Sequence, residues 1–247
     1  MSGRSTWSIG SVTVIGRPLS AKCENLRFLI LPAQMTGVKM AHMAQVRPYR
    51  GVDAVDRVAD RRRRLLNAGL DLLGAAGKDP AELTVRAICG QAGLGVRYFY
   101  ESFNDKDDFV GAVFDSVIAD MATTIQAAVA AASPAGQARA AMADIVRTIS
   151  ADPRVGRLLF SVELSNSMIV CKRAESTALF AALLFAHAGA QGALDNDHVK
   201  ASTHFAVGGV GQTISAWLSG EVSLDHDELV GVLAALIDQL AAMPPKP

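Results

Sequence analysis

Residues 83–109 of this chain read LTVRAICGQAGLGVRYFYESFNDKDDF. Two short helical patterns in this stretch flank the turn Ala92-Gly93-Leu94-Gly95, because glycine interrupts a helix. Thr84 is a good N-cap for the first pattern, since its hydroxyl can accept from early helix amides. The stretch therefore predicts a helix-turn-helix, in which the later helix is free to enter a DNA major groove. Such helix pairs also occur in proteins that never touch DNA.

Helical patterns lie on both sides of this stretch. Apolar residues repeat at helical spacing from Leu65 to Ala76, in a pattern that begins near Asp56. Asn104 or Asp105 can cap a further helix that reaches about residue 132. We therefore predict a three-helix domain over residues 51–110.

The remaining chain, residues 111–247, also predicts helices. Its start signals are capping side chains, two of them followed by proline: Ser133 with Pro134, Asp152 with Pro153, Asp195 or Asn196, and Asp225 with Glu228. The predicted fold class is all-α, with an N-terminal three-helix head followed by a helical bundle.

Residues 1–50 show no sustained hydrophobic period, and we predict a poorly ordered extension. Two alternatives remain open. The extension is a functional basic arm, or translation starts at Met40 or Met43 and the extension does not belong to the native protein.

The net charge of zero conceals an asymmetry. Residues 1–100 carry 15 Lys/Arg and 7 Asp/Glu (+8), whereas residues 101–247 carry 9 and 17 (−8). A basic N-terminal part joined to an acidic part indicates that one end meets a polyanion, unless the charges are merely solvated surface.

Several classes of function lack a matching motif in the sequence. It has no Gly-x-Ser-x-Gly, phosphate-binding loop, His-Glu-x-x-His or paired-cysteine motif, so we expect no enzyme, catalytic residue or cofactor. Its three cysteines have no histidine at ligand spacing, so we expect no metal site. The longest apolar stretch, residues 178–186, is too short to span a bilayer, and we see no targeting segment. We expect a cytoplasmic protein.

Residues 57–110 resemble the DNA-binding head of the TetR (tetracycline repressor) family. The resemblance rests on the Thr84-x-Arg86 start, the Ala-Gly turn, the Tyr100-x-x-Phe103 pair and Lys106 ahead of an apolar residue. The remaining chain matches that family only in the number and length of its helices.

The resemblance implies that the third helix reads the major groove. The residues matching Tyr100 and Lys106 hold the phosphate backbone in that family, and the arginine matching Arg86 reaches a base or a phosphate. The expected DNA-binding residues are Thr84, Arg86, Gly95, Val96, Arg97, Tyr98, Tyr100 and Lys106.

Two positions depart from the family pattern. A glycine or proline is common where Arg97 stands, and a threonine or serine where Tyr98 stands. We predict that Val96, Arg97 and Tyr98 face the groove, and that Arg97 and Tyr98 carry much of the sequence choice. Some of the four arginines 61–64 approach the DNA backbone, or they form a solvated face.

The resemblance also implies a homodimer formed by the last two long helices, with recognition helices about 34 Å apart on a palindromic operator. The predicted helix 197–219 contains three interior glycines: Gly208, Gly209 and Gly211. Interior glycines are tolerated where another backbone comes close or a ligand needs room.

An effector pocket is expected among the middle helices. Its apolar candidates are equally plausible as plain core: Met121, Ile125, Phe160, Met168, Phe180 and Trp217. His187 and His204 are structural or polar pocket residues.

The expected mechanism is a population shift. A small apolar or amphipathic effector binds one arrangement of the fourth helix, changes the spacing of the two heads and releases DNA. The protein is then a repressor, with activation as an alternative. The rival hypothesis is a helical sensing or partner-binding module without DNA binding.

Overall fold

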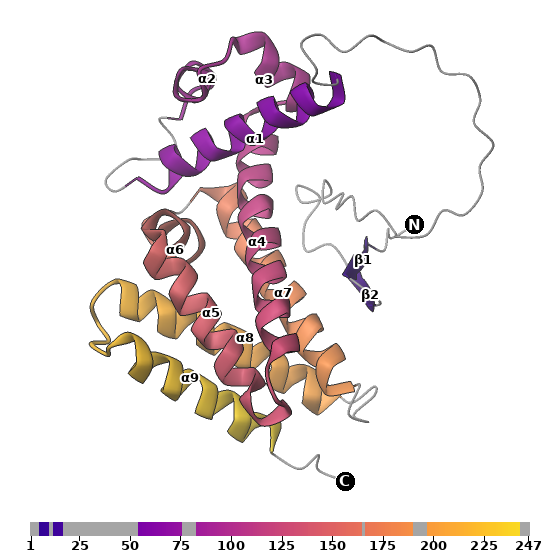
Figure 1. Cartoon of the computed structure of the whole chain (residues 1–247), viewed down its shortest axis with the longest axis vertical. Coiled ribbons are helices and arrows are strands. Elements are labelled where there is room, and N and C mark those ends of the chain that lie inside the picture. Colours follow the sequence, from indigo (N-terminus) through magenta and orange to yellow (C-terminus); the bar gives the residue numbers. More distant parts are fainter. Residues whose placement is uncertain are drawn as a thin grey trace, which may run out of the picture. The chain divides into compact units, whose positions relative to one another are not determined.

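The computed structural model describes residues 5–9, 12–16, 54–75, 83–164, 166–189 and 197–242 (Figure 1). The chain forms two compact units, residues 1–62 and 63–247, whose boundary falls within the first helix. In the first unit, strands β1 (Ser5–Ile9) and β2 (Val12–Gly16) pair antiparallel, a hairpin that the predicted poorly ordered extension did not include. Otherwise the predicted extension over residues 1–50, with its alternative start sites, lies outside the described residues.

Among the described residues from 54 onward every regular element is helical, which confirms the all-α fold class. The helices are α1 (Ala54–Leu73), α2 (Val85–Ala92), α3 (Val96–Ser102), α4 (Lys106–Ala131), the short 3₁₀ helix η2 (Pro134–Gly136), α5 (Gln137–Ala151), α6 (Pro153–Phe160), α7 (Ser167–Gly189), α8 (Asp197–Leu218) and α9 (His226–Ala241). The functional boundary predicted at residue 110 falls along α4, inside the second unit, and stays a prediction.

Most of the predicted helix starts form the expected caps. Side chains accept from backbone amides at Thr84 (3.2 Å, from Ala87), Asp105 (2.8 Å, from Asp108) and Asp152 (3.0 Å, from Arg154), and Asp225 with Glu228 forms a complete capping box. Ser133 forms no such bond, because the chain first makes η2 there and α5 begins only at Gln137.

Three phenylalanines form the centre of the head, α1 to α3. The ring centroids of Phe99, Phe103 and Phe109 lie 5.0 to 5.5 Å apart in each pairing, and all three side chains are buried. Tilted and edge-on aromatic pairs add to the stabilisation from apolar burial. Phe109 belongs to α4, so the cluster fastens the head to the long helix that continues into the body.

Gly69 lets α1 approach α4 closely. A Cβ at that position would lie 2.5 Å from a Val113 methyl and 2.6 Å from the Phe109 ring. Any larger residue would therefore push α1 away from α4.

The body, α4 to α9, is a bundle in which α4 packs against α5, α6 and α7, α5 against α9, and α7 against α8. By length and composition alone, α4 is the one helix of the described segments that could cross a membrane. Nine of its residues between Phe109 and Ala122 are buried inside the protein, and 33% of its most apolar 18-residue stretch is buried.

An ion triad centred on the buried Lys172 joins α4 to α7, and its two carboxylates are partly buried. The Lys172 ammonium lies 3.0 Å from an Asp115 oxygen and 3.2 Å from a Glu175 oxygen. Burial raises the pKa of both carboxyl groups, and the neighbouring ammonium only partly offsets that effect. Removing one partner from such a group leaves uncompensated buried charge, so the triad fixes the pairing of the two helices.

Candidate nucleic-acid interface

The turn between α2 and α3 is closed by a left-handed glycine. Gly93 has φ +63°, and the Leu94 amide donates to the Cys89 carbonyl at 2.9 Å. This geometry satisfies carbonyls at the end of α2 and favours a residue without a Cβ. The predicted helix-turn-helix is therefore present, with three residues, 93–95, between α2 and α3.

Arg64 supports the turn from α1. Its Nη2 donates to the Ala92 carbonyl at 2.7 Å and to the Gly93 carbonyl at 3.2 Å. These contacts join residues 28 and 29 positions apart, which is why a local pattern gave no sign of them. Of the four arginines 61–64, Arg64 thus has a structural role in the head.

Arg97 is the second residue of α3, and its side chain is 86% exposed. Its Nε donates to Glu101 Oε1 at 2.7 Å, one helical turn later. An exposed pair of this kind contributes little to stability, about 0.2–1 kcal/mol. The guanidinium is therefore held on the surface of α3 and can exchange Glu101 for another acceptor at little cost.

Tyr100 lies on the same helix and is 61% exposed. Its ring packs edge-on against Phe99, with centroids 5.3 Å apart. Val96 is exposed at the start of α3, and Tyr98 is half-buried. Buried Phe99 thus anchors α3 to the head while its neighbours remain on the surface.

The other predicted residues lie at helix starts. Thr84 caps α2 and Arg86 is exposed in its first turn, whereas Lys106 is half-buried at the first position of α4. Within the described segments, neither Arg86 nor Lys106 forms an ion pair with a carboxylate. The structure places all the predicted residues on α2, on α3, at their N-caps or at the start of α4.

Gly95 differs from Gly93 in what the fold requires of it. Gly95 has φ −74°, which any residue adopts, and a Cβ there would meet nothing within 4 Å. Packing within this chain therefore does not require a glycine at position 95. A small residue at a helix start does permit close approach by a second molecule.

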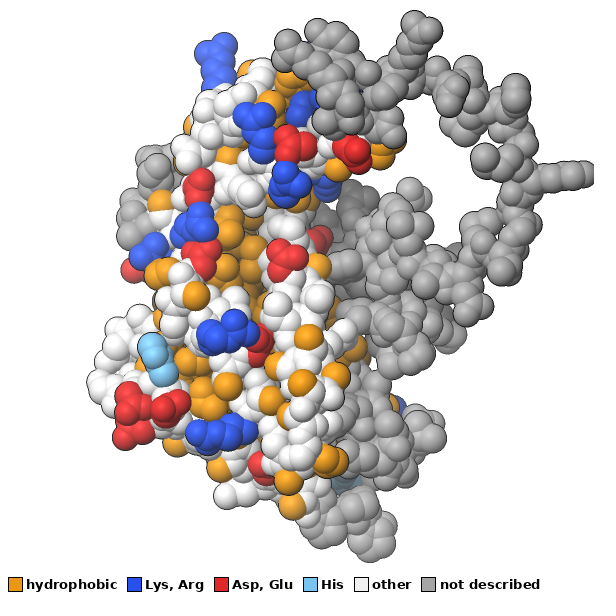
Figure 2. Space-filling view, viewed as in Figure 1, with side chains coloured by type: hydrophobic (Ala, Val, Ile, Leu, Met, Phe, Trp, Pro, Cys, Tyr) orange, Lys and Arg blue, Asp and Glu red, His pale blue; other side chains and the backbone are white. Residues whose placement is uncertain are grey.

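Basic side chains are denser over the head than over the lower body on the face drawn in Figure 2, with acidic side chains among them. Within the described segments, no three His, Cys, Asp or Glu side chains gather in a way that could hold a metal ion.

The six pocket candidates all contact the core. Met121 is buried, and the other five are half-buried and pack against the core: Ile125, Phe160, Met168, Phe180 and Trp217. The Trp217 indole N–H donates to the Leu224 carbonyl at 2.8 Å, so its polar atom already serves the fold. His204 is exposed on α8, and the His187 side chain lies outside the described residues.

Three solved structures illustrate what this architecture is similar to. The fatty acid degradation regulator FadR from Bacillus halodurans is 16% identical, covers 75% of this chain and 97% of its own, and has a TM-score of 0.59. FadR from Bacillus subtilis, in complex with stearoyl-CoA, is 15% identical, with 73% and 97% covered and a TM-score of 0.55. A TetR-family regulator from Syntrophomonas wolfei is 15% identical, with 75% and 96% covered and a TM-score of 0.61.

The sequence matches no family model. It also matches no curated protein. The chain nevertheless has the all-helical fold of the TetR-family transcriptional regulators, along nearly the full length of the structures compared.

Proposed function

We propose that this chain is a TetR-like, non-enzymatic DNA-binding transcriptional regulator that acts as a homodimer on a palindromic operator. The observation that carries the proposal is the outward face of α3, where Arg97 and Tyr100 are exposed on a helix anchored by buried Phe99. A basic and aromatic surface on the second helix of a helix-turn-helix suits the major groove and its phosphates.

Each predicted residue has a chemical role in this proposal. Arg97 offers a paired donor to guanine, and Val96 and Tyr98 contact neighbouring bases. Tyr100, Lys106 and the Thr84–Arg86 start of α2 contact phosphates and fix the register. Gly95 lets the α3 backbone approach the DNA closely, a role supported by the open space around it.

The proposed dimer uses exposed stripes on α8 and α9, which we call the α8–α9 face. On α8 the members recur every three or four residues, and on α9 they lie three, four and seven residues after the first, so each set falls on one side of its helix. Its members are small, apolar or uncharged: Ala201, Phe205, Gly208 and Gln212 on α8, and Val232, Ala235, Leu236 and Gln239 on α9.

Two features support a second copy as the occupant of this face. Phe205 is 70% exposed and Leu236 50% exposed, which is costly in water. A Cβ at Gly208 or Gly209 would meet nothing within 4 Å, so the chain's own packing does not require these helix-weakening glycines. Close approach of a partner helix would account for them.

The proposed effector is a small apolar or amphipathic molecule that binds the body and releases the operator, so that the protein acts as a repressor in the cytoplasm. A long-chain acyl-CoA is the first class to test, because the similar Bacillus subtilis regulator was solved with stearoyl-CoA. We also propose that the effector pocket is lined by residues from among the six candidates, of which one is buried and five are half-buried.

A gel-shift titration tests the proposal. The full chain is mixed with the DNA upstream of its own gene, in excess random DNA, with and without stearoyl-CoA. We expect a specific shift that an Arg86→Ala/Arg97→Ala double variant loses. Arg139→Ala, which removes an exposed arginine from α5, should leave the shift intact.

The outcomes separate the alternatives. A folded chain that shifts neither its own promoter nor DNA selected from a random pool supports the sensing or partner-binding module and overturns the proposal. Equal shifts by the double variant and by Arg139→Ala would place the DNA contact elsewhere on the chain.

A further inference from the structure

The Arg97 guanidinium on α3 is held at one edge only. Its Nε donates to Glu101 Oε1 at 2.7 Å, and this bond lays the side chain along the surface of the helix. Among the described residues, no group accepts from its terminal nitrogens Nη1 and Nη2. Because the guanidinium is a rigid planar fork of N–H donors, a partner at Nε leaves the edge formed by Nη1 and Nη2 open.

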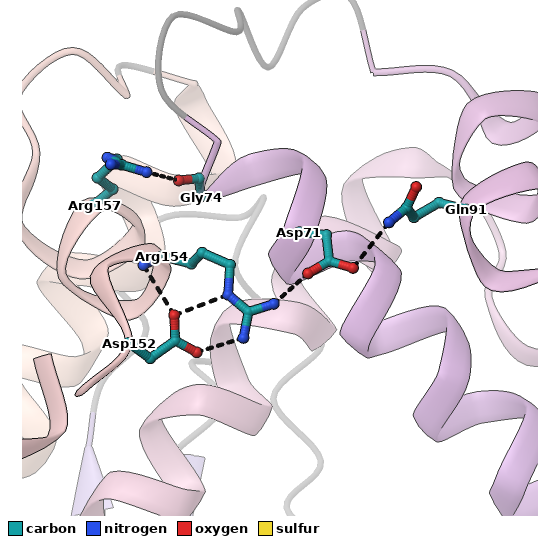
Figure 3. Close-up of polar contacts among 6 residues, drawn as sticks. All are labelled: Asp71, Gly74, Gln91, Asp152, Arg154 and Arg157. Atoms are coloured by element: carbon teal, nitrogen blue, oxygen red, sulfur yellow. Dashed lines mark hydrogen bonds and ion pairs between the residues drawn. The ribbon is translucent and has the colours of Figure 1, made fainter.

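Arg154 shows the opposite arrangement (Figure 3). It donates through Nε and Nη2 to Asp152, at 2.8 and 2.6 Å, and through Nη1 to Asp71, so all three of its nitrogens serve the fold. Asp71 also accepts from the Gln91 amide at 3.0 Å. Arg97 differs, because the described part of the chain does not use its terminal nitrogens and leaves them for a second molecule.

The exposure of the Arg97–Glu101 pair suits contact with DNA. The Arg97 side chain is 86% exposed, whereas the Glu101 side chain is 38% exposed, so the carboxylate is partly covered and the guanidinium projects into solvent. In the major groove, guanine presents its acceptors O6 and N7 side by side, and a bidentate donor matches them. Nη1 and Nη2 are such a donor pair, and they can bind guanine while Nε stays with Glu101.

The helix-turn-helix stretch is acidic rather than basic. Residues 83–109 carry three basic and four acidic residues, a net charge of −1. Two of the acids serve local structure, since Asp105 caps α4 and Asp108 accepts from the backbone and side-chain amides of Asn104 at 2.9 and 3.0 Å. Glu101 instead pairs with the arginine of α3. Carboxylates repel phosphates, so this stretch gains little from indiscriminate charge attraction and depends more on contacts to bases.

We propose that Glu101 is a positioning residue that makes Arg97 a reader of guanine. By holding Nε it aims Nη1 and Nη2 at the O6 and N7 acceptors of one guanine in each operator half-site, and its charge disfavours a phosphate in their place. Because the guanidinium is oriented before DNA binds, less side-chain freedom is lost in the complex. This inference rests on the proposed DNA-binding function and adds to it the base that α3 selects and the residue that sets the selection.

Operator variants first locate the base pair. Each position of one half-site, in the promoter fragment that the wild-type chain shifts, is substituted in turn, and fluorescence anisotropy gives the affinities of the wild type and Arg97→Ala. The base pair whose preference Arg97→Ala loses is the one that Arg97 reads. We expect a G·C pair there, preferred about 5- to 150-fold by the wild type. Another base pair at that position, or no loss of preference at any position, overturns the inference.

Three variants then test Glu101. Glu101→Ala removes the acceptor and the charge, Glu101→Gln keeps an acceptor for Nε, and Asp107→Asn removes an exposed charge from the same stretch. We expect Glu101→Ala to lower the guanine preference by about 3- to 10-fold, Glu101→Gln to retain most of it, and Asp107→Asn to leave it unchanged. Affinity for random DNA should rise by about 2- to 5-fold in all three, because each loses a charge that repels phosphates.

A merely structural role of Glu101 would give a different result. Because the pair is exposed, all three variants should unfold near the wild-type temperature, and damage to the fold would weaken binding to every DNA alike. An unchanged guanine preference in Glu101→Ala, or an equal loss in Asp107→Asn, overturns the inference. A wild-type chain that binds no DNA would instead overturn the proposed function, and this inference with it.

Discussion

The outward face of α3 and the α8–α9 face are both exposed, yet their chemistry is opposite. The first presents Arg97 and Tyr100, whereas the second presents Phe205, Gly208 and Leu236. A polyanion is attracted by charge and by hydrogen-bond donors, and a second copy of a helix is attracted by small and apolar groups. The contrast teaches that the two faces offer different chemistry, which suits the two different partners that we propose for them.

The largest effect is expected from breaking the α8–α9 face. Leu236→Asp places a charge at the proposed centre of the dimer, so we expect monomers in sedimentation. Operator affinity should fall by about 100-fold or more, because two linked heads bind with a high effective concentration. Val170→Asp, at a similarly exposed valine of α7, is the matched control and should remain dimeric.

A dimer that survives Leu236→Asp, Phe205→Asp and the combination of the two would remove the α8–α9 face from the proposal.

The next effect concerns the sequence choice made by α3. Arg97→Ala should weaken operator binding by about 1–3 kcal/mol, whereas affinity for random DNA should change much less, because paired contacts to a base carry the specificity. Fluorescence anisotropy with both DNAs measures the ratio. An unchanged ratio of specific to random affinity would show that Arg97 does not read bases.

A smaller and more uniform effect is expected at the start of α4. Lys106→Ala should weaken binding to operator and random DNA alike, and should reduce the slope of log affinity against log salt by about 1. Titrations at several salt concentrations give the slope. Arg139→Ala should leave it unchanged, and a wild-type slope in Lys106→Ala would show that this lysine does not contact phosphate.

The smallest effects separate the two glycines of the turn. Gly93→Ala should lower the free energy of unfolding by about 1–2 kcal/mol, because its φ is left-handed. Gly95→Ala should change stability by less than about 1 kcal/mol but weaken operator binding by about 3- to 10-fold, the loss of roughly one backbone contact. Thermal unfolding and anisotropy measure the two quantities. A Gly95→Ala variant with wild-type affinity would leave that glycine unexplained.

The sequence by itself determined the elements whose causes are local. The caps at Thr84, Asp105, Asp152 and Asp225 each join atoms two or three residues apart, so residue types predict them, although Asn104 was an equal candidate beside Asp105. The helix-turn-helix was equally readable, because the glycines and apolar spacing that form it lie within one short stretch. Among the predicted starts that the structure describes, the exception is Ser133, where a 3₁₀ turn precedes the helix. The predicted start at Asp195 or Asn196 lies outside the described residues.

The tertiary structure decided what depends on distant residues. The bonds from Arg64 to the turn, from Arg154 to Asp71 and from Gln91 to Asp71 join positions 20 to 83 residues apart, and no periodicity encodes such pairs. Packing also decided that Gly93 is required by its backbone while Gly95 stands in open space. Local hydrogen bonding and hydrophobic spacing thus specify helices and their ends, but only the folded chain determines which side chains remain exposed for a partner.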